Sequence, residues 1–223
     1  WDLVPDPESF GGRFTVLVEP NPRRAIERGL NLLDADQKSE TDLKPVDNLV
    51  CMPSEATSAG INFPNLFDAV IKEQSRDSWR GFDKYDRRTY PQRNAQVRAV
   101  QYHSCRGMEG WSTLCLGLDR FFDFQHRNPR LNKEMIEQGL REKEGFFFSE
   151  GLLAQQLDQE ARKFAINWLM IPLTRSIDHL IVHLTDENSA LGKVLQSVND
   201  ANSGTVEWIR PNVFGGGERM LDL

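Results

Sequence analysis

A histidine, a thiol, a guanidinium and a carboxylate follow one another within one short stretch of this chain. The segment VQYHSCRGMEGWSTLCLGLD carries His103, Cys105, Arg106 and Glu109 between two apolar runs that are typical of buried strands. Side chains of these types bind metals, act as nucleophiles or contact polar ligands. Three interpretations follow: a metal or thiol site, a structural turn, or a loop that handles a ligand.

The metal and thiol interpretations find little support elsewhere in the sequence. The cysteines, Cys51, Cys105 and Cys115, form no Cys-x-x-Cys pair, and two of them stand within apolar runs, where a cysteine is usually a small buried residue. Arg106 could lower the pKa of Cys105, but no third residue marks an oriented Cys–His pair. We therefore predict neither a metal site nor a covalent nucleophile here.

Arg175 stands out because its neighbours, in LMIPLTRSIDHLIVHL, are almost all apolar. Burying a guanidinium without an anion is costly, and a phosphate suits its planar fork of donors. The P-loop pattern Gly-x-x-x-x-Gly-Lys-Ser/Thr is absent, so the chain lacks the backbone cradle and lysine with which a nucleotidase holds phosphates. Arg175 thus predicts a phosphate contact, in a chain that cannot by itself supply the rest of a nucleotidase site.

Composition sets the broad class of protein. The chain has 223 residues, 39% of them hydrophobic, and a net charge of -6, which fits one substantial domain and argues against a surface that is basic all over. No apolar run approaches the roughly 18 residues of a membrane span. An odd number of cysteines and no signal-peptide pattern favour a cytoplasmic location.

Segments with strand and helix character alternate along the chain. Strands are predicted at 13–20, 48–53, 96–103, 113–119, 178–184 and 204–210, and helices at 21–37, 63–74, 132–144, 149–170 and 189–201. This alternation predicts an α/β fold whose mostly parallel sheet has helices on both faces. Ligands are then expected at the carboxyl ends of the strands, near residues 21–24, 103–109 and 174–175.

Residues 75–98 interrupt the alternation and are predicted to be an irregular excursion. Seven Arg or Lys residues stand there against three Asp, with Trp79, Phe82, Tyr85 and Tyr90 between them. Such a segment either contacts nucleic acid, because aromatics stack on bases while arginines follow phosphates, or is a solvated loop whose aromatics cover the core. The candidate contacts are Arg87, Arg88 and Tyr85.

Three of these segments, in this order, resemble motifs of the second RecA-like motor domain of superfamily 1 DNA helicases of the UvrD/Rep type. VEPNPRRAIERGLNLL is similar to motif IV, VQYHSCRGMEGWSTLCL to motif V, and INWLMIPLTRSIDHLIVHL to motif VI, commonly NLLYVALTRAKDHLYL. The resemblance covers most of residues 14–185. The matching residues are Asn21, Arg23 and Ile26; His103, Ser104, Gly107 and Glu109; and Asn167, Leu173, Thr174, Arg175, Asp178, His179 and Leu180.

The resemblance implies a RecA-like fold and roles for individual residues. Arg23 and Arg175 would reach the γ-phosphate of ATP as arginine fingers, which stabilise charge on the transferred phosphoryl group. Glu109 would contact the sugar of the nucleotide, and Gly107 would belong to the same ATP-binding site. His103 and Ser104 would touch single-stranded DNA.

The resemblance also implies partners. They are single-stranded DNA and an N-terminal P-loop motor domain that this chain lacks, which would hold most of the ATP and its Mg²⁺; the chain alone is predicted to be inactive. We expect one RecA-like domain at 1–213 and a flexible tail at 214–223. A non-catalytic nucleotide-sensing or protein-docking module is the alternative function, and a single-strand binder acting through residues 75–98 is a third.

Overall fold

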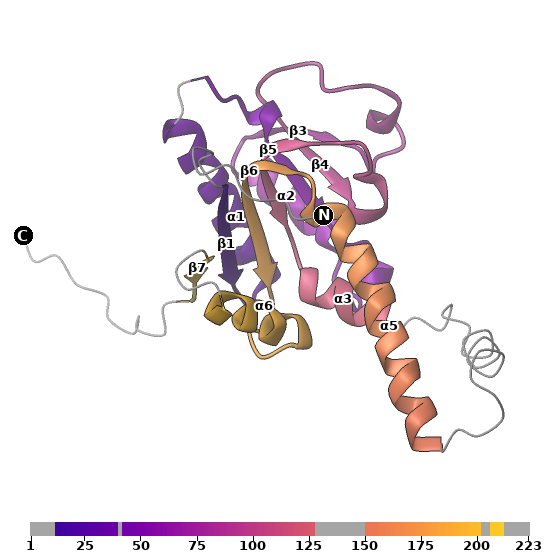
Figure 1. Cartoon of the computed structure of the whole chain (residues 1–223). Coiled ribbons are helices and arrows are strands. Elements are labelled where there is room, and N and C mark those ends of the chain that lie inside the picture. Colours follow the sequence, from indigo (N-terminus) through magenta and orange to yellow (C-terminus); the bar gives the residue numbers. More distant parts are fainter. Residues whose placement is uncertain (1–11, 40–41, 128–149, 202–205, 212–223) are drawn as a thin grey trace, which may run out of the picture.

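One parallel sheet organises the protein (Figure 1). The computed structural model describes residues 12–39, 42–127, 150–201 and 206–211. The seven strands lie in the order β3-β4-β2-β5-β6-β1-β7, and every pairing is parallel. The predicted α/β fold with a mostly parallel sheet is confirmed. The strands are β1 (Arg13–Val18), β2 (Leu49–Met52), β3 (Asp77–Arg80), β4 (Gln96–Gln101), β5 (Gly110–Cys115), β6 (Ser176–Leu184) and β7 (Val206–Ile209).

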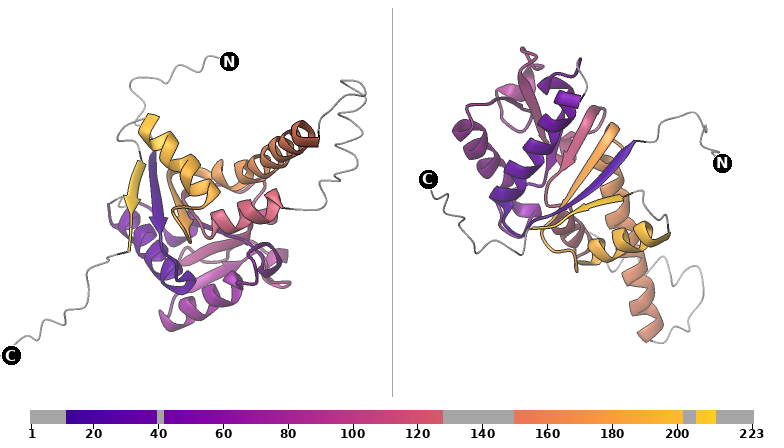
Figure 2. Two further views of the ribbon diagram at one scale, coloured as in Figure 1. Left: turned by 90° about the horizontal axis from the view of Figure 1, so that it is seen from below. Right: turned by 90° about the vertical axis from the view of Figure 1, so that its left-hand side faces the viewer.

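Helices cover both faces of the sheet (Figure 2). On one face, α1 (Pro22–Ser39) and α2 (Phe63–Glu73) bury apolar stripes that include Ile26, Leu30 and Phe67 against the sheet. On the other face lie α3 (Leu118–His126), α5 (Glu150–Leu173) and α6 (Ala190–Ala201), which pack through Phe121, Leu169 and other apolar residues. The sheet is therefore buried between two cores, as its apolar strands require. None of the described helices is long and apolar enough to cross a lipid bilayer.

Three elements differ from the sequence-based expectation, among them α3, which was not predicted. The segment 75–98 is not irregular throughout, because Asp77–Arg80 forms the edge strand β3, which pairs with β4 from Asp77↔Gln96 to Arg80↔Ala99. The predicted strand at 113–119 ends at Cys115; Gly117, with φ of 58°, turns the chain into α3. The predicted helix at 132–144 and the tail at 214–223 lie outside the described residues.

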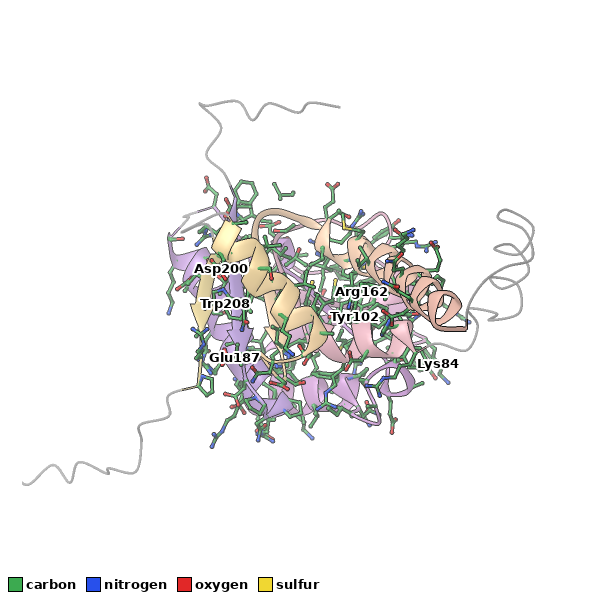
Figure 3. The ribbon with its side chains drawn as sticks, turned by 60° about the horizontal axis from the view of Figure 1, so that its bottom comes forward. Lys84, Tyr102, Arg162, Glu187, Asp200 and Trp208 are labelled. Atoms are coloured by element: carbon green, nitrogen blue, oxygen red, sulfur yellow. The ribbon has the colours of Figure 1, made fainter. Side chains whose placement is uncertain are left out.

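The connection between β4 and β5, residues 102–109, contains no α-helix. Because β2 lies between these two strands, the connection crosses β2 and returns from the carboxyl edge of the sheet to the amino edge. Tyr102 and Cys105 anchor it: both are fully buried, and the Tyr102 hydroxyl donates a hydrogen bond to the carbonyl of Leu116 at 2.6 Å. Tyr102 lies in the interior of the molecule (Figure 3). Residues 102–109 thus form a crossover connection that is anchored by buried side chains.

His183 in β6 is a fully buried histidine with both ring nitrogens engaged. Its Nδ1 accepts a hydrogen bond from the backbone N–H of Gly117 at 2.8 Å, and its Nε2 contacts the carbonyl of Glu19 at 2.9 Å. A carbonyl only accepts, so Nε2 carries the proton and the ring is neutral. Burial lowers the pKa of His183 below its ordinary value.

We expect this histidine to make stability depend on pH. With a lowered folded-state pKa, the stability that neutral His183 contributes is fully present above about pH 6.5 and is lost as the pH falls through the folded-state value. Urea unfolding between pH 8 and pH 5 should show this loss in the unaltered chain and much less of it in His183→Gln. His126→Gln, which changes a partly exposed histidine, is the control and should keep the full pH dependence. If the free energy of unfolding changed equally with pH in the unaltered chain and in His183→Gln, the assignment of a neutral ring would be contradicted.

Candidate functional site

Arg175 and the end of the β4–β5 crossover lie side by side at the amino edge of the sheet. Arg175 is in the turn between α5 and β6, and its carbonyl accepts a hydrogen bond from the backbone N–H of Gly110 at 2.9 Å. Gly110 is paired with Ser176, the residue after Arg175. Two segments that are far apart in the sequence are therefore held together by neighbouring strands.

The guanidinium of Arg175 is half-buried and has only neutral partners in the described part of the chain. Its Nη2 donates to the hydroxyl of Thr174 at 2.9 Å, and its Nη1 lies 3.5 Å from the carbonyl of Met108. Its Nε is buried and has no hydrogen-bond partner among the described residues. Since a buried cation is costly without an anion, this geometry fits a site that receives an anion from outside the chain.

A second arginine, Arg98 of β4, holds the same segment from the other side. Its Nη2 donates to the carbonyls of Glu109 at 2.7 Å and of Asp47 at 3.3 Å, and burial lowers the pKa of its guanidinium. No ion pair of Arg98 is present in the described residues. The sequence-based reasoning missed Arg98, although a charged residue between Val97 and Ala99, both buried in β4, was a readable signal.

Glu109 and Gly107 complete the amino-edge loop. The side chain of Glu109 is exposed, while its backbone is fixed by Arg98. Gly107 adopts a φ of 76°, a left-handed conformation that favours glycine, and open space surrounds the position that a Cβ would take. A ligand can therefore approach the backbone here closely, beside the exposed carboxylate of Glu109.

His103 and Ser104 lie at the other end of the crossover, next to the carboxyl end of β4. Both are exposed, and the His103 ring packs edge-on against Trp168 of α5, with centroids 5.1 Å apart. The guanidinium of Arg106 lies 5.5 Å from the Trp168 ring centroid. Although His103 is exposed overall, partial desolvation of its packed ring first, and the charge of Arg106 second, lower its pKa, so this ring is neutral at pH 7. Trp168 of α5 thus packs against this end of the crossover through His103 and Arg106.

The predicted location of the site needs a correction. Arg175 and Glu109 lie at the amino edge of the sheet, not at the carboxyl edge, because each directly precedes its strand. Arg23 does lie at the carboxyl edge, in the first turn of α1, where it forms ion pairs with Glu27 and Glu73. The length of β6 separates the two edges by about 26 Å, at 3.3 Å per residue. Arg23 and Arg175 therefore do not converge on one phosphate within this chain.

The candidate DNA contacts of the excursion are arranged around Trp79. The indole N–H of this buried residue donates to the carbonyls of Asp86 and Thr89, at 3.0 and 2.9 Å, and so fixes the loop that follows β3. Arg88 is exposed on that loop, and Tyr85 is 69% exposed with the Lys84 ammonium 4.8 Å from its ring centroid. The side chain of Arg87 lies outside what the structure describes.

The three cysteines lie in the core that faces α5. All are free and fully buried. Burial raises the pKa of Cys51 well above its ordinary value, and a contact with Cys51, followed by burial, raises the pKa of Cys105. Thiols of this kind stay protonated at neutral pH and are poor nucleophiles. Among the described residues, no group of three or more His, Cys, Asp or Glu side chains could hold a metal ion.

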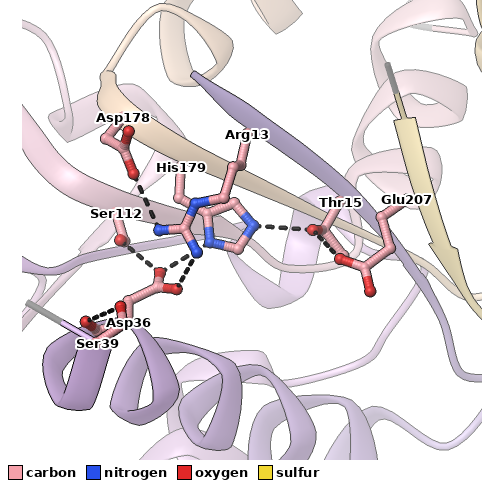
Figure 4. Close-up of polar contacts among 8 residues, drawn as sticks. All are labelled: Arg13, Thr15, Asp36, Ser39, Ser112, Asp178, His179 and Glu207. Carbon is pink, nitrogen blue, oxygen red and sulfur yellow. Dashed lines mark hydrogen bonds and ion pairs between the residues drawn. The ribbon is translucent and has the colours of Figure 1, made fainter. Parts of the chain in front are cut away.

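A buried polar network fixes the strand that follows Arg175 (Figure 4). Asp36 of α1 accepts hydrogen bonds from His179 Nδ1 at 2.8 Å, from Ser112 Oγ at 2.6 Å and from Arg13 Nη1 at 2.9 Å. The other ring nitrogen of His179 contacts the Thr15 hydroxyl at 2.8 Å. The network joins α1, β1, β5 and β6, and it is a structural support for the amino edge. Asp36 continues the buried stripe of α1 beyond Leu33, a spacing that could have revealed it.

Comparison with known proteins gives little further information. No family model matches the chain, and no curated protein matches it. Among solved structures, the C-terminal domain of a possible DNA helicase from Lactobacillus plantarum WCFS1 aligns over 89% of this chain and 86% of that chain, with 16% sequence identity and a TM-score of 0.48. A likeness at this level does not bear on what the chain binds or does.

Proposed function

We propose that the chain is the C-terminal motor domain of a superfamily 1 ATP-dependent DNA helicase or translocase of the UvrD/Rep type. One observation carries the proposal. The residues that resemble motifs V and VI meet at one edge of the sheet, although they are far apart in the sequence. There the backbone N–H of Gly110 donates a hydrogen bond to the carbonyl of Arg175, and the Arg175 guanidinium contacts the carbonyl of Met108. The partner would be an N-terminal P-loop domain, against which this edge closes.

Arg175 is the proposed arginine finger. ATP with Mg²⁺, bound mainly by the P-loop domain, supplies the phosphoryl group that is transferred to water. The site fits such a ligand, because Arg175 Nε is buried without a partner in the described residues and its other donors meet only neutral oxygens. Its guanidinium would stabilise the charge that develops on the γ-phosphoryl group. The exposed carboxylate of Glu109 would accept a hydrogen bond from a sugar hydroxyl.

Single-stranded DNA is the proposed second ligand. His103 and Ser104 are exposed at the opposite end of the same crossover, and the excursion with Arg88 and Tyr85 adds further exposed cationic and aromatic side chains. Because residues 102–109 join the two ends, the nucleotide contact and the DNA contact would be parts of one segment. This arrangement would couple nucleotide state to the grip on the strand.

The first test is whether hydrolysis requires the partner domain. The 223-residue chain alone should show no ATP hydrolysis above background, whereas the full-length protein with its P-loop domain should hydrolyse ATP, and faster with single-stranded DNA. Phosphate release measured with and without DNA gives the answer. Hydrolysis by the isolated chain that is lost in Arg175→Ala would contradict the need for a partner. A full-length protein that binds but never hydrolyses ATP would favour the nucleotide-sensing module.

A further inference from the structure

A hollow opens at the amino edge between the loop that follows β3 and the end of the crossover. Its cavity volume is about 430 Å³, within the range of roughly 300 to 1,000 Å³ that is usual for small-molecule sites. Trp79 and Arg98, which are register partners on β3 and β4, contribute to its lining. Arg88 and Tyr90 line it from the first loop, and Met108 and Glu109 from the crossover.

Cationic and aromatic side chains both line the hollow, and the two arginines have no carboxylate partner among the described residues. Neither Arg88 nor Arg98 has an ion pair in the described part of the chain, and Arg98 Nε is buried there without a hydrogen-bond partner. Tyr90 is 85% exposed, which leaves its ring face free for stacking. An arginine pair suits a phosphate, and an exposed aromatic ring suits a planar base.

The walls of the hollow are fixed before any ligand arrives. The double hydrogen bond from Trp79 holds Asp86 and Thr89, and the carboxylate of Asp86 accepts from the backbone N–H of Arg80 at 3.1 Å. The opposite wall is held by Arg98 through the carbonyl of Glu109. A site whose walls are ordered in advance loses less entropy on binding.

We propose that this hollow binds one nucleoside 5′-phosphate unit, with the phosphate on Arg88 and Arg98 and the base on Tyr90. The ligand is either a free nucleotide or one nucleotide of a single strand, since both present the same chemistry. The proposal rests on the proposed function in one respect, because Glu109 belongs to both sites. Arg175 does not line the hollow, so loss of hydrolysis in Arg175→Ala and binding in the hollow can fail independently.

The test uses the 223-residue chain and calorimetric titration with 5′-AMP, adenosine and a short oligothymidylate. Tyr90→Ala and Arg88→Ala, which change exposed residues, should each weaken binding by about tenfold. Adenosine, which lacks the phosphate, should bind more weakly than 5′-AMP to the unaltered chain. Arg93→Ala is the matched control: Arg93 is an exposed arginine of the same excursion, outside the hollow and ion-paired with Asp77 at 2.8 Å.

The competition arm identifies the source of the nucleotide. Binding of 5′-AMP that the oligothymidylate does not displace supports a free nucleotide, and tight binding of the oligothymidylate that 5′-AMP does not displace supports a strand. Either result supports the proposal if Tyr90→Ala and Arg88→Ala weaken it and Arg93→Ala does not. The proposal is overturned if neither ligand binds at millimolar concentration, or if Arg93→Ala weakens binding as much as Arg88→Ala.

Discussion

Replacing Arg175 with alanine in the full-length protein should lower ATP turnover by roughly 10³- to 10⁵-fold, the effect of losing an arginine finger. Affinity for single-stranded DNA should change little, because Arg175 lies at the amino edge, away from His103 and Ser104. Arg175 forms no ion pair among the described residues, so its replacement should cost the fold little stability. Steady-state hydrolysis and fluorescence anisotropy with a labelled strand measure the two quantities separately.

Two further substitutions sharpen this experiment. Arg175→Lys keeps the charge but loses the planar fork, so it should restore only part of the activity. Arg23→Ala removes an arginine that lies at the opposite edge and pairs with Glu27 and Glu73, and it should leave turnover within a few-fold of the unaltered protein. A loss in Arg23→Ala as large as that in Arg175→Ala would show that a partner brings both edges to the nucleotide. Equal losses of turnover and DNA affinity in Arg175→Ala would instead indicate a structural arginine.

Replacing Asp36 with alanine should lower the free energy of unfolding by about 3 to 5 kcal/mol, the usual cost of breaking a buried charge pair. Asp36 is 3% exposed and accepts from Arg13, Ser112 and His179, so its removal leaves the buried donors of Ser112 and His179 unsatisfied, whereas Arg13 is partly exposed and keeps its ion pair with Asp178. Asp34→Ala is the matched control on the same helix. Asp34 pairs with Arg76 near the surface, and its loss should cost about 1 kcal/mol or less.

The effect of Asp36→Ala should also depend on pH. Burial, the largest single influence, would raise the pKa of Asp36, but hydrogen bonds from His179 and Ser112 and the charges of His179 and Arg13 outweigh it and lower the pKa. The stability from this carboxylate is therefore present above about pH 3.9 and lost as the pH falls through the lower folded-state value. Urea unfolding from pH 7 to pH 3 should show the difference between the two chains shrinking in acid. A difference of less than 1 kcal/mol at pH 7 would show that the network contributes little.

Local patterns predicted those elements whose residues carry a clear period. The helical stripe of α1 and the apolar runs of β1, β2 and β6 were readable in this way, and together they established the α/β class. β3 was not readable, because DSWR has one buried residue, Trp79, and becomes a strand only through pairing with β4. Edge strands of this kind depend on partners that are distant in sequence.

The sequence singled out Arg175 and the crossover as candidate site residues, but it did not predict that Arg175 and the end of the crossover lie together at the amino edge of the sheet. The adjacency of Arg175 and the crossover depends on the order of strands in the sheet, which periodicity does not contain. One signal was available: Arg175 precedes DHLIVHL, and a residue before a strand of a parallel sheet lies at the amino edge. Arg98 could be singled out by its two buried apolar neighbours, but the hollow beside it depends on the pairing of β3 with β4 and could be recognised only in three dimensions.

The crossover between β4 and β5 has a mechanical consequence. Parallel strands are usually joined through a helix, whose ends can shift without moving the strands they connect. Here a short span is clamped at Trp168 at one end and by Arg98 at the other, and extended chain reaches at most about 3.6 Å per residue. Such a span links its two ends directly, because both ends are held and no α-helix lies between them. In the proposed motor, a change in the nucleotide contact at one end of this span would therefore be passed to the strand contact at the other end.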